Sequence, residues 1–114
     1  MPFINTITTT KIDKAEQQTL TQKYGKAIEL IRGKTESWLM LKFEGEAKMA
    51  FRGDCRADCA MVGVDLYGNA SDEDLDAFTA QITKILNETL NIPTDRVYVR
   101  YFSTPFWGYD GTNI

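Results

Sequence analysis

The sequence predicts an α+β fold in which two βαβ units form one four-stranded sheet with both helices on one of its faces. The first observation behind this prediction is that strand, helix and strand patterns follow one another twice within 114 residues. The second is that each helix pattern opens with a capping signal and carries apolar residues at helical spacing. Right-handed crossovers then place both helices on the same face. We expect a single domain over residues 1–114, without a linker or a low-complexity segment.

The first half of the chain contains the first βαβ pattern. The opening MPFINTITTT sets three apolar residues among four threonines, which indicates a strand, and Pro2 is tolerated at its first position. A helix is expected next, with Asp13 and Glu16 as a capping box and Gly33 as the glycine that ends it. Residues 37–44, SWLMLKFE, predict the second strand. The apolar stripe of the helix consists of Leu20, Tyr24, Ala27, Ile28 and Ile31.

The second half repeats this plan. Residues 59–67, CAMVGVDLY, predict a strand. Ser71 together with Asp74 signals a helix start, and Pro93 follows the expected helix end. Residues 95–103, DRVYVRYFS, predict the closing strand. The apolar stripe of this helix consists of Leu75, Phe78, Ile82, Ile85, Leu86 and Leu90.

The two faces of the last strand differ in chemistry because side chains alternate along it. The side expected to face the helices carries Val97, Val99 and Tyr101. The opposite side carries Arg96, Tyr98, Arg100 and Phe102. In a monomer, the helix-free face of the sheet would expose Trp38, Met40, Met61, Tyr67 and Phe102. Such a patch usually marks an interface, so we expect an oligomer packed through this open face.

Composition excludes several classes of function. Lys and Arg total 13 against 16 Asp and Glu, and this net charge of −3 argues against a nucleic-acid partner. No apolar run is long enough to span a bilayer, so no membrane partner is expected. No secretory signal is present, which makes the cytoplasm the default compartment and leaves secretion without a signal peptide open.

Histidine is absent, which excludes Ser-His-Asp and Cys-His arrangements and His-ligated metals. We expect no metal and no other cofactor. If the chain is an enzyme, another group must carry protons near neutral pH. The N-terminal amine, with an ordinary pKa of about 7.7–8.0, lies nearest to that range.

Five short motifs occur in a fixed order along this plan. Pro2 directly follows Met1, Gly-Lys at 33–34 follows the first helix pattern, and MAF occupies 49–51. DRVYV begins the last strand, and WGYDGTNI ends the chain. Together they resemble the macrophage migration inhibitory factor family of the tautomerase superfamily, over essentially the whole chain.

This resemblance implies a homotrimer whose sheets line a central barrel and whose active sites lie at subunit interfaces. It also implies keto–enol tautomerisation of aryl pyruvates such as phenylpyruvate, and isomerisation of dopachrome-type compounds, without a cofactor. Pro2, freed by removal of Met1, would be the catalytic base. Lys34 would bind the carboxylate of the keto or enol substrate and stabilise the enolate. Apolar surroundings and a nearby cation would lower the pKa of such an amine toward the operating pH.

The resemblance further implies which residues contact the substrate. Tyr98 matches a family tyrosine that reaches the site from the neighbouring subunit. Trp38, Tyr67 and Ile114 fall where the family places apolar or aromatic walls and backbone contacts.

Two positions depart from the mammalian pattern. Arg100 stands where the mammalian cytokine has asparagine, and an arginine there can pair bidentately with a carboxylate, which favours an acidic substrate or a dicarboxylate. Trp107 and Tyr109 flank Gly108, and Tyr109 occupies the slot of the mammalian tryptophan.

Plainer interpretations of these residues stay open. Pro2 suits the start of a strand, Lys34 suits the C-terminal end of a helix, and Arg100 suits an ion pair between subunits. The encoded Met1, if retained, would make the Pro2 nitrogen an amide without basicity. The rival function is a cytokine-like secreted protein that binds a receptor and has a vestigial pocket, because one fold carries both roles.

The two cysteines have the spacing CRADC, at Cys55 and Cys59. Only Cys59 falls on the CxxC found in some members of the family, with Val62 in the second slot. We therefore expect reduced thiols rather than a redox site.

Overall fold

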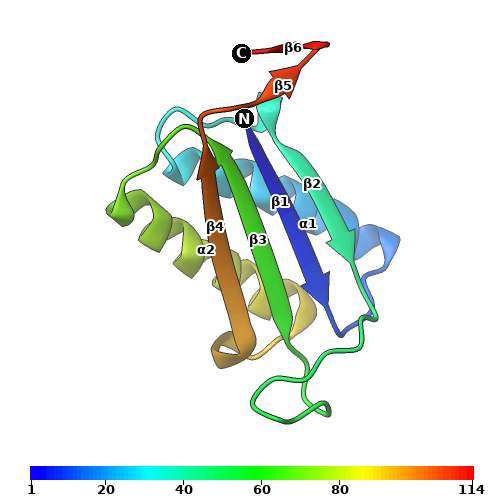
Figure 1. Ribbon diagram of the computed structural model, residues 1–114. Coiled ribbons are helices and arrows are strands. Elements are labelled where there is room, and N and C mark those ends of the chain that lie inside the picture. The colour runs from blue at the N-terminus through cyan, green and yellow to red at the C-terminus, as the bar shows by residue number, and fades with distance from the viewer.

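The computed structural model describes residues 1–114 as one mixed four-stranded sheet, ordered β2-β1-β3-β4, with both long helices against one face (Figure 1). The central strands β1 (Pro2–Thr8) and β3 (Ala60–Tyr67) run antiparallel. The edge strand β2 (Met40–Glu44) pairs in parallel with β1, and the edge strand β4 (Val97–Thr104) pairs in parallel with β3. The predicted α+β fold of two βαβ units is confirmed.

Each long helix begins at the predicted capping residue. Before α1 (Lys14–Ala27), the Asp13 carboxylate accepts from the backbone N–H of Glu16, and the Glu16 carboxylate accepts from that of Asp13. Before α2 (Asp72–Leu90), the Ser71 hydroxyl accepts from the backbone N–H three residues further on. These bonds satisfy donors that the first turn of a helix otherwise leaves free.

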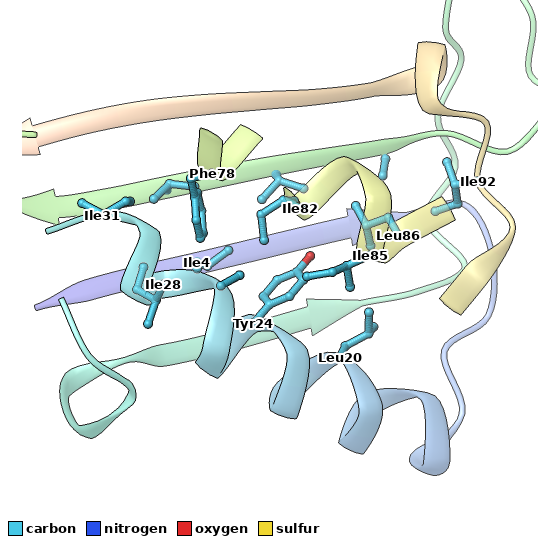
Figure 2. Packing of buried hydrophobic residues seen from close by; sticks show 14 of the residues in the cluster. Ile4, Leu20, Tyr24, Ile28, Ile31, Phe78, Ile82, Ile85, Leu86 and Ile92 are labelled. Carbon is cyan, nitrogen blue, oxygen red and sulfur yellow. The ribbon is translucent and has the colours of Figure 1, made fainter. Parts of the chain in front are cut away.

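The core lies between the sheet and the two helices (Figure 2). It contains both predicted helix stripes and the inward side chains of β1 and β3, which alternate strictly along each strand. One polar pair lies inside it: the hydroxyls of Thr6 on β1 and Tyr24 on α1 share a hydrogen bond of 2.9 Å. Burial raises the pKa of Tyr24 far above its ordinary value.

The end of the first helix differs from the prediction. The α-helix stops at Ala27 and continues as a 3₁₀ turn, η1 (Ile28–Leu30). Apolar residues three apart still share one side of a 3₁₀ turn, so the stripe runs on through Ile31, which is buried. Gly33 is not the helix C-cap; it lies in the next turn with a φ of +82°.

The second strand is shorter than predicted. Its alternating pattern reaches back to Ser37, but residues Glu36–Trp38 form a 3₁₀ turn, η2, and β2 starts at Met40. A further 3₁₀ turn, η3 (Thr94–Arg96), precedes β4. The chain ends in a hairpin that the sequence did not predict.

This hairpin consists of β5 (Gly108–Tyr109) and β6 (Thr112–Asn113) and lies beyond the end of the sheet, near the N-terminus (Figure 1). Its turn residues Asp110 and Gly111 have φ of +52° and +83°. Asp-Gly is a preferred pair for a two-residue hairpin turn with positive φ at both positions.

The face of the sheet without helices is apolar and exposed, as predicted. Met40 is 67% exposed and Tyr98 61%, and Trp38 and Phe102 are also exposed, whereas Met61 is half-buried. None of the helices combines the length and the apolar character that crossing a membrane requires.

Candidate active site

A pocket of about 280 Å³ opens at the end of the sheet where β1 begins. Its walls come from the chain start, from segment 37–40 and from segment 107–109, and seven of its ten lining residues are apolar. A larger hollow of about 480 Å³ on the outer surface of α1 has no apolar residue in its wall. Ligand sites are mostly apolar with a few directed polar groups, so the pocket at the chain start is the candidate site.

Lys34 is held next to the chain start by the turn that follows η1. Gly33, directly before it, has a left-handed backbone that residues with a Cβ adopt only at a cost. Asp74 in the first turn of α2 fixes this turn, because its carboxylate accepts from the backbone N–H of Arg32 at 3.1 Å. The Lys34 Nζ donates to the carbonyl of Tyr67 at 2.7 Å. An ammonium has three donors; a second one is directed at the Met1 amine, so one remains for a ligand.

The terminal amine of Met1 lies beside Lys34, and its pKa is lowered from 8.0 to about 6. Partial burial is the largest cause, because it disfavours the charged form, and the Lys34 ammonium lowers the pKa further by repulsion and a hydrogen bond. The Met1 carbonyl accepts from the backbone N–H of Tyr67 at 3.2 Å, and Pro2 is buried. A neutral amine at pH 7 can accept a proton.

The C-terminal hairpin supplies another wall of the pocket. The ring of Tyr109 meets that of Trp38 edge to face, with centroids 5.1 Å apart. The backbone N–H of Ile114 donates to the carbonyl of Trp107 at 2.9 Å, and the Tyr67 hydroxyl donates to the carbonyl of Ile114 at 3.4 Å. Six of the eight predicted site residues therefore lie together at one end of the sheet: Pro2, Lys34, Trp38, Tyr67, Tyr109 and Ile114.

The other two predicted residues, Tyr98 and Arg100, lie away from this pocket. In the sheet register Pro2 is level with Ser103, whereas Tyr98 is level with Ile7. The separation of five residues along the strands corresponds to roughly 16 Å. Within one chain, Tyr98 therefore cannot reach a ligand bound beside Pro2.

Arg100 lies on the open face without an anionic partner. No ion pair of the chain includes it, and its guanidinium carbon lies 4.8 Å from the ring centroid of Phe102. A guanidinium nitrogen lies 3.6 Å from where a Cβ on Gly63 would stand. The guanidinium therefore lies over Gly63 of β3.

The sequence did not identify Met1, Phe3 and Met40 as pocket residues. Phe3 and Met40 are register partners on β1 and β2, and both line the pocket. Parallel pairing of the first two strands was predictable, but the register was not, because the start of β2 was misplaced. No sequence pattern indicates where the Met1 amine lies, because its position depends on tertiary contacts.

The chain has no group of three or more acidic, cysteine or histidine side chains placed to hold a metal ion. Cys55 is exposed and Cys59 is buried, and both are free thiols.

Comparisons with known proteins agree with the fold. The sequence profile of the family described as Macrophage migration inhibitory factor (MIF) matches residues 1–114. No curated protein sequence matches the chain. The structure is similar to MIF2 of Leishmania major, with 31% identity, a TM-score of 0.93, and coverage of 100% of this chain and 97% of that one.

Two further solved structures share the fold. The MIF homologue of Prochlorococcus marinus is 23% identical with a TM-score of 0.88, and 97% of each chain is covered. The protein Pt0534, in a structure described as inactivated by 2-oxo-3-pentynoate, is 18% identical with a TM-score of 0.78, and 90% of this chain and 85% of that one are covered. The fold is that of the tautomerase superfamily. Within it, the chain belongs to the macrophage migration inhibitory factor family.

Proposed function

We propose that this protein is a tautomerase that interconverts the keto and enol forms of aryl pyruvates such as phenylpyruvate, and that it isomerises dopachrome-type compounds. The observation that carries the proposal is the terminal amine beside Lys34, at an apolar pocket, with a pKa lowered to about 6. An amine that is neutral at pH 7 suits a reaction in which one group takes a proton and gives it back.

In the proposed mechanism, removal of Met1 makes the Pro2 nitrogen the free terminal amine. Pro2 lies in the first position of β1, at the same end of the sheet as Lys34, and a nearby cation lowers the pKa of an amine. The secondary amine has one lone pair and a fixed ring. It is therefore oriented without the entropy loss of a flexible side chain.

The proton transfer proceeds in two steps. The Pro2 nitrogen takes a proton from the carbon next to the carbonyl of the keto acid, and the C–H electron pair forms the C=C bond. The carbonyl oxygen becomes an enolate. The Lys34 ammonium stabilises both this enolate and the carboxylate of the substrate. The protonated Pro2 amine then gives its proton to the enolate oxygen, which yields the enol and restores the neutral amine, and the reverse sequence returns the keto form.

The 2-oxo acid named for Pt0534 gives a chemical probe of this proposal. In 2-oxo-3-pentynoate the triple bond is conjugated to a 2-oxo acid, so a neutral amine can add to it. On this chain we expect addition at the Pro2 nitrogen, with the carboxylate near Lys34. Lys34→Met should slow the labelling.

The proposed active unit is a homotrimer. Tyr98 is exposed on the open face at the far end of the sheet from Pro2. A neighbouring subunit would bring its Tyr98 to the pocket and would cover the exposed apolar residues. Arg100 lies two residues further along the same face of β4 and would accompany Tyr98, which favours a substrate with a second carboxylate.

The first test is tautomerase activity of a preparation whose intact mass shows that Met1 is removed. Pro2→Gly should lower kcat/KM for phenylpyruvate by about 100-fold, within the range by which positioned acid–base groups accelerate reactions. Pro93→Gly is the matched control, because Pro93 is exposed and lies at the other end of the sheet. Light scattering should give a trimer for all three proteins.

Three results would overturn parts of the proposal. Equal kcat/KM for Pro2→Gly and the unmutated protein would remove Pro2 as the base. Absence of turnover in the processed protein would remove the enzyme function altogether. A monomer by light scattering would remove the shared site, and with it the roles of Tyr98 and Arg100.

A further inference from the structure

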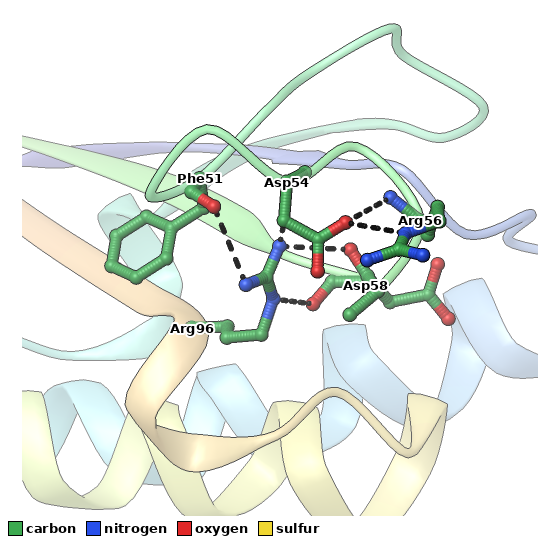
Figure 3. Close-up of polar contacts among 6 residues, drawn as sticks. Phe51, Asp54, Arg56, Asp58 and Arg96 are labelled. Carbon is green, nitrogen blue, oxygen red and sulfur yellow. Dashed lines mark hydrogen bonds and ion pairs between the residues drawn. The ribbon is translucent and has the colours of Figure 1, made fainter.

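The side chain of Arg96, directly before β4, holds the loop between β2 and β3 by four hydrogen bonds. Arg96 donates from Nε to the carbonyl of Asp58 at 2.9 Å, and from its terminal nitrogens to three other carbonyls of segment 51–58 (Figure 3). Those three are Phe51, Asp54 and Ala57, at 3.4, 3.1 and 3.0 Å. One guanidinium therefore holds both ends of this segment.

Arg56, which lies within the segment, has a different role. Arg56 is exposed and contacts Asp54, from its backbone N–H at 2.8 Å and from its Nε at 3.3 Å. This contact lowers the pKa of the Asp54 carboxyl. Arg56 thus makes a local pair within the loop, whereas Arg96 connects the loop to the strand that carries Tyr98.

The fastened loop places the ring of Phe51 against Tyr98. The two rings meet edge to face at 76°, with centroids 5.0 Å apart. The guanidinium carbons of Arg96 and Arg52 lie 5.2 and 5.1 Å from the Phe51 ring centroid. Cation–π contacts of this length are favourable. Phe51 is therefore fixed by its backbone, through Arg96, and by contacts of its ring.

Tyr98 has little else to fix it within the subunit. Its side chain is 61% exposed, makes no hydrogen bond in the chain, and contacts one aromatic ring, that of Phe51. A side chain that reaches out to a ligand must be held in one rotamer beforehand, or its ordering reduces the affinity. Phe51 supplies a wall against which the Tyr98 ring can rest.

We propose that Phe51 and Arg96 are positioning residues that set the orientation of the Tyr98 side chain, with Phe51 acting on the ring and Arg96 acting through the loop that carries Phe51. The consequence for substrate rests on the proposed function, in which Tyr98 contributes to the site of a neighbouring subunit. Neither positioning residue touches the substrate itself. Their effect should therefore be on KM more than on kcat.

Kinetics of four variants test this proposal. Phe51→Leu and Arg96→Gln should each raise KM for phenylpyruvate about fivefold to tenfold while kcat changes less than twofold, as expected when binding contacts of one side chain are weakened. Phe51→Tyr keeps the ring and should restore the normal KM. Arg56→Gln is the matched control in the same loop, and its KM should be unchanged.

A double-mutant cycle separates positioning from general loop stability. If Phe51 acts on KM only through Tyr98, then Phe51→Leu should add nothing to the effect of Tyr98→Ala. Additive effects on KM would show that Phe51 acts by another route and would overturn the proposal.

A spectroscopic readout keeps the inference independent of activity. With 3-fluorotyrosine incorporated, the fluorine resonance of Tyr98, assigned by its loss in Tyr98→Phe, should shift in Phe51→Leu and in Arg96→Gln, but not in Arg56→Gln. An unshifted resonance in both test variants would overturn the inference. A shifted resonance in a protein without turnover would leave the positioning intact and would overturn the proposed function instead.

Discussion

The Nζ of Lys34 donates a hydrogen bond of 2.7 Å to the carbonyl of Tyr67, and the backbone N–H of Tyr67 donates in turn to the carbonyl of Met1. The end of β3 thus holds both the cation and the chain start. Because one residue fixes both groups, the spacing between the ammonium and the terminal amine is set by the sheet and not by flexible side chains. This arrangement keeps a positive charge next to the Met1 amine, which favours the neutral form of that amine.

The first prediction concerns the dependence of activity on pH. An amine is a base only when it is unprotonated, and the surroundings of the chain start lower the pKa of the Met1 amine from 8.0 to about 6. After removal of Met1 the Pro2 amine would lie at the same end of the sheet as Lys34, so we expect kcat/KM to rise with pH and to level off below pH 8. Rates measured between pH 4.5 and 9 check this, and a break near pH 8 would contradict it.

Lys34→Met is the companion variant for the pH profile. It removes the repulsion and the hydrogen bond but leaves the partial burial, which is the larger cause of the lowered pKa. The break in the profile should therefore move upward, toward but not as far as 8.0. Lys26→Met, on the exposed surface of α1, should leave the break where it is.

The second prediction concerns Gly33, whose φ of +82° belongs to the left-handed region. Gly33→Ala should lower the free energy of unfolding by about 1 kcal/mol, because a Cβ is disfavoured there. It should also lower kcat/KM, since the turn that carries Lys34 must shift. Gly33→Asn is the matched control. Asparagine tolerates this conformation, so the free energy of unfolding, measured with urea, should fall less in Gly33→Asn than in Gly33→Ala. Equal losses for the two variants would show that backbone conformation is not the cause.

The third prediction concerns the hydrogen-bonded hydroxyls of Thr6 and Tyr24, which are buried in the core between the sheet and the helices. Tyr24→Phe removes one partner and leaves the Thr6 hydroxyl buried without a hydrogen bond, which should cost about 1–2 kcal/mol of unfolding free energy. Adding Thr6→Val removes both polar groups and should recover most of that loss. Urea unfolding of the single and double variants measures this. A double variant less stable than Tyr24→Phe would contradict it.

The parts of the fold that depend on local chemistry were predictable from the sequence. The capping carboxylate of Asp13 and the capping hydroxyl of Ser71 act on donors three residues away, so no tertiary information is needed to find them. Strand alternation likewise separated Val99 and Tyr101, which pack against the core, from Tyr98 and Phe102, which are exposed.

The parts that depend on tertiary contacts were not predictable. Trp38 fits the alternation of a strand, but the chain has to turn from Lys34 into β2, and the 3₁₀ turn at 36–38 makes that bend. Gly25 is unfavourable inside a helix, yet it lies within α1, and the Glu36 carboxylate packs where a Cβ on Gly25 would stand. The contact between Arg96 and the loop at 51–58 could not be predicted from the sequence. The acceptors are backbone carbonyls, which every residue has, so no particular residue type marks the contact.

The two βαβ units are related by an approximate twofold axis through the sheet, between β1 and β3. On β1 and β2, Phe3 pairs with Met40; on β3 and β4, Met61 pairs with Tyr98. The axis relates these two pairs, so Met40 is equivalent to Tyr98. By the same offset, Trp38 is equivalent to Arg96. At one end the equivalent space is an open pocket, and at the other it is filled by segment 51–58. The two ends of the subunit therefore differ although the βαβ plan repeats. A contact between one end and the opposite end of a second copy would be head-to-tail, and such contacts give a ring when the rotation closes.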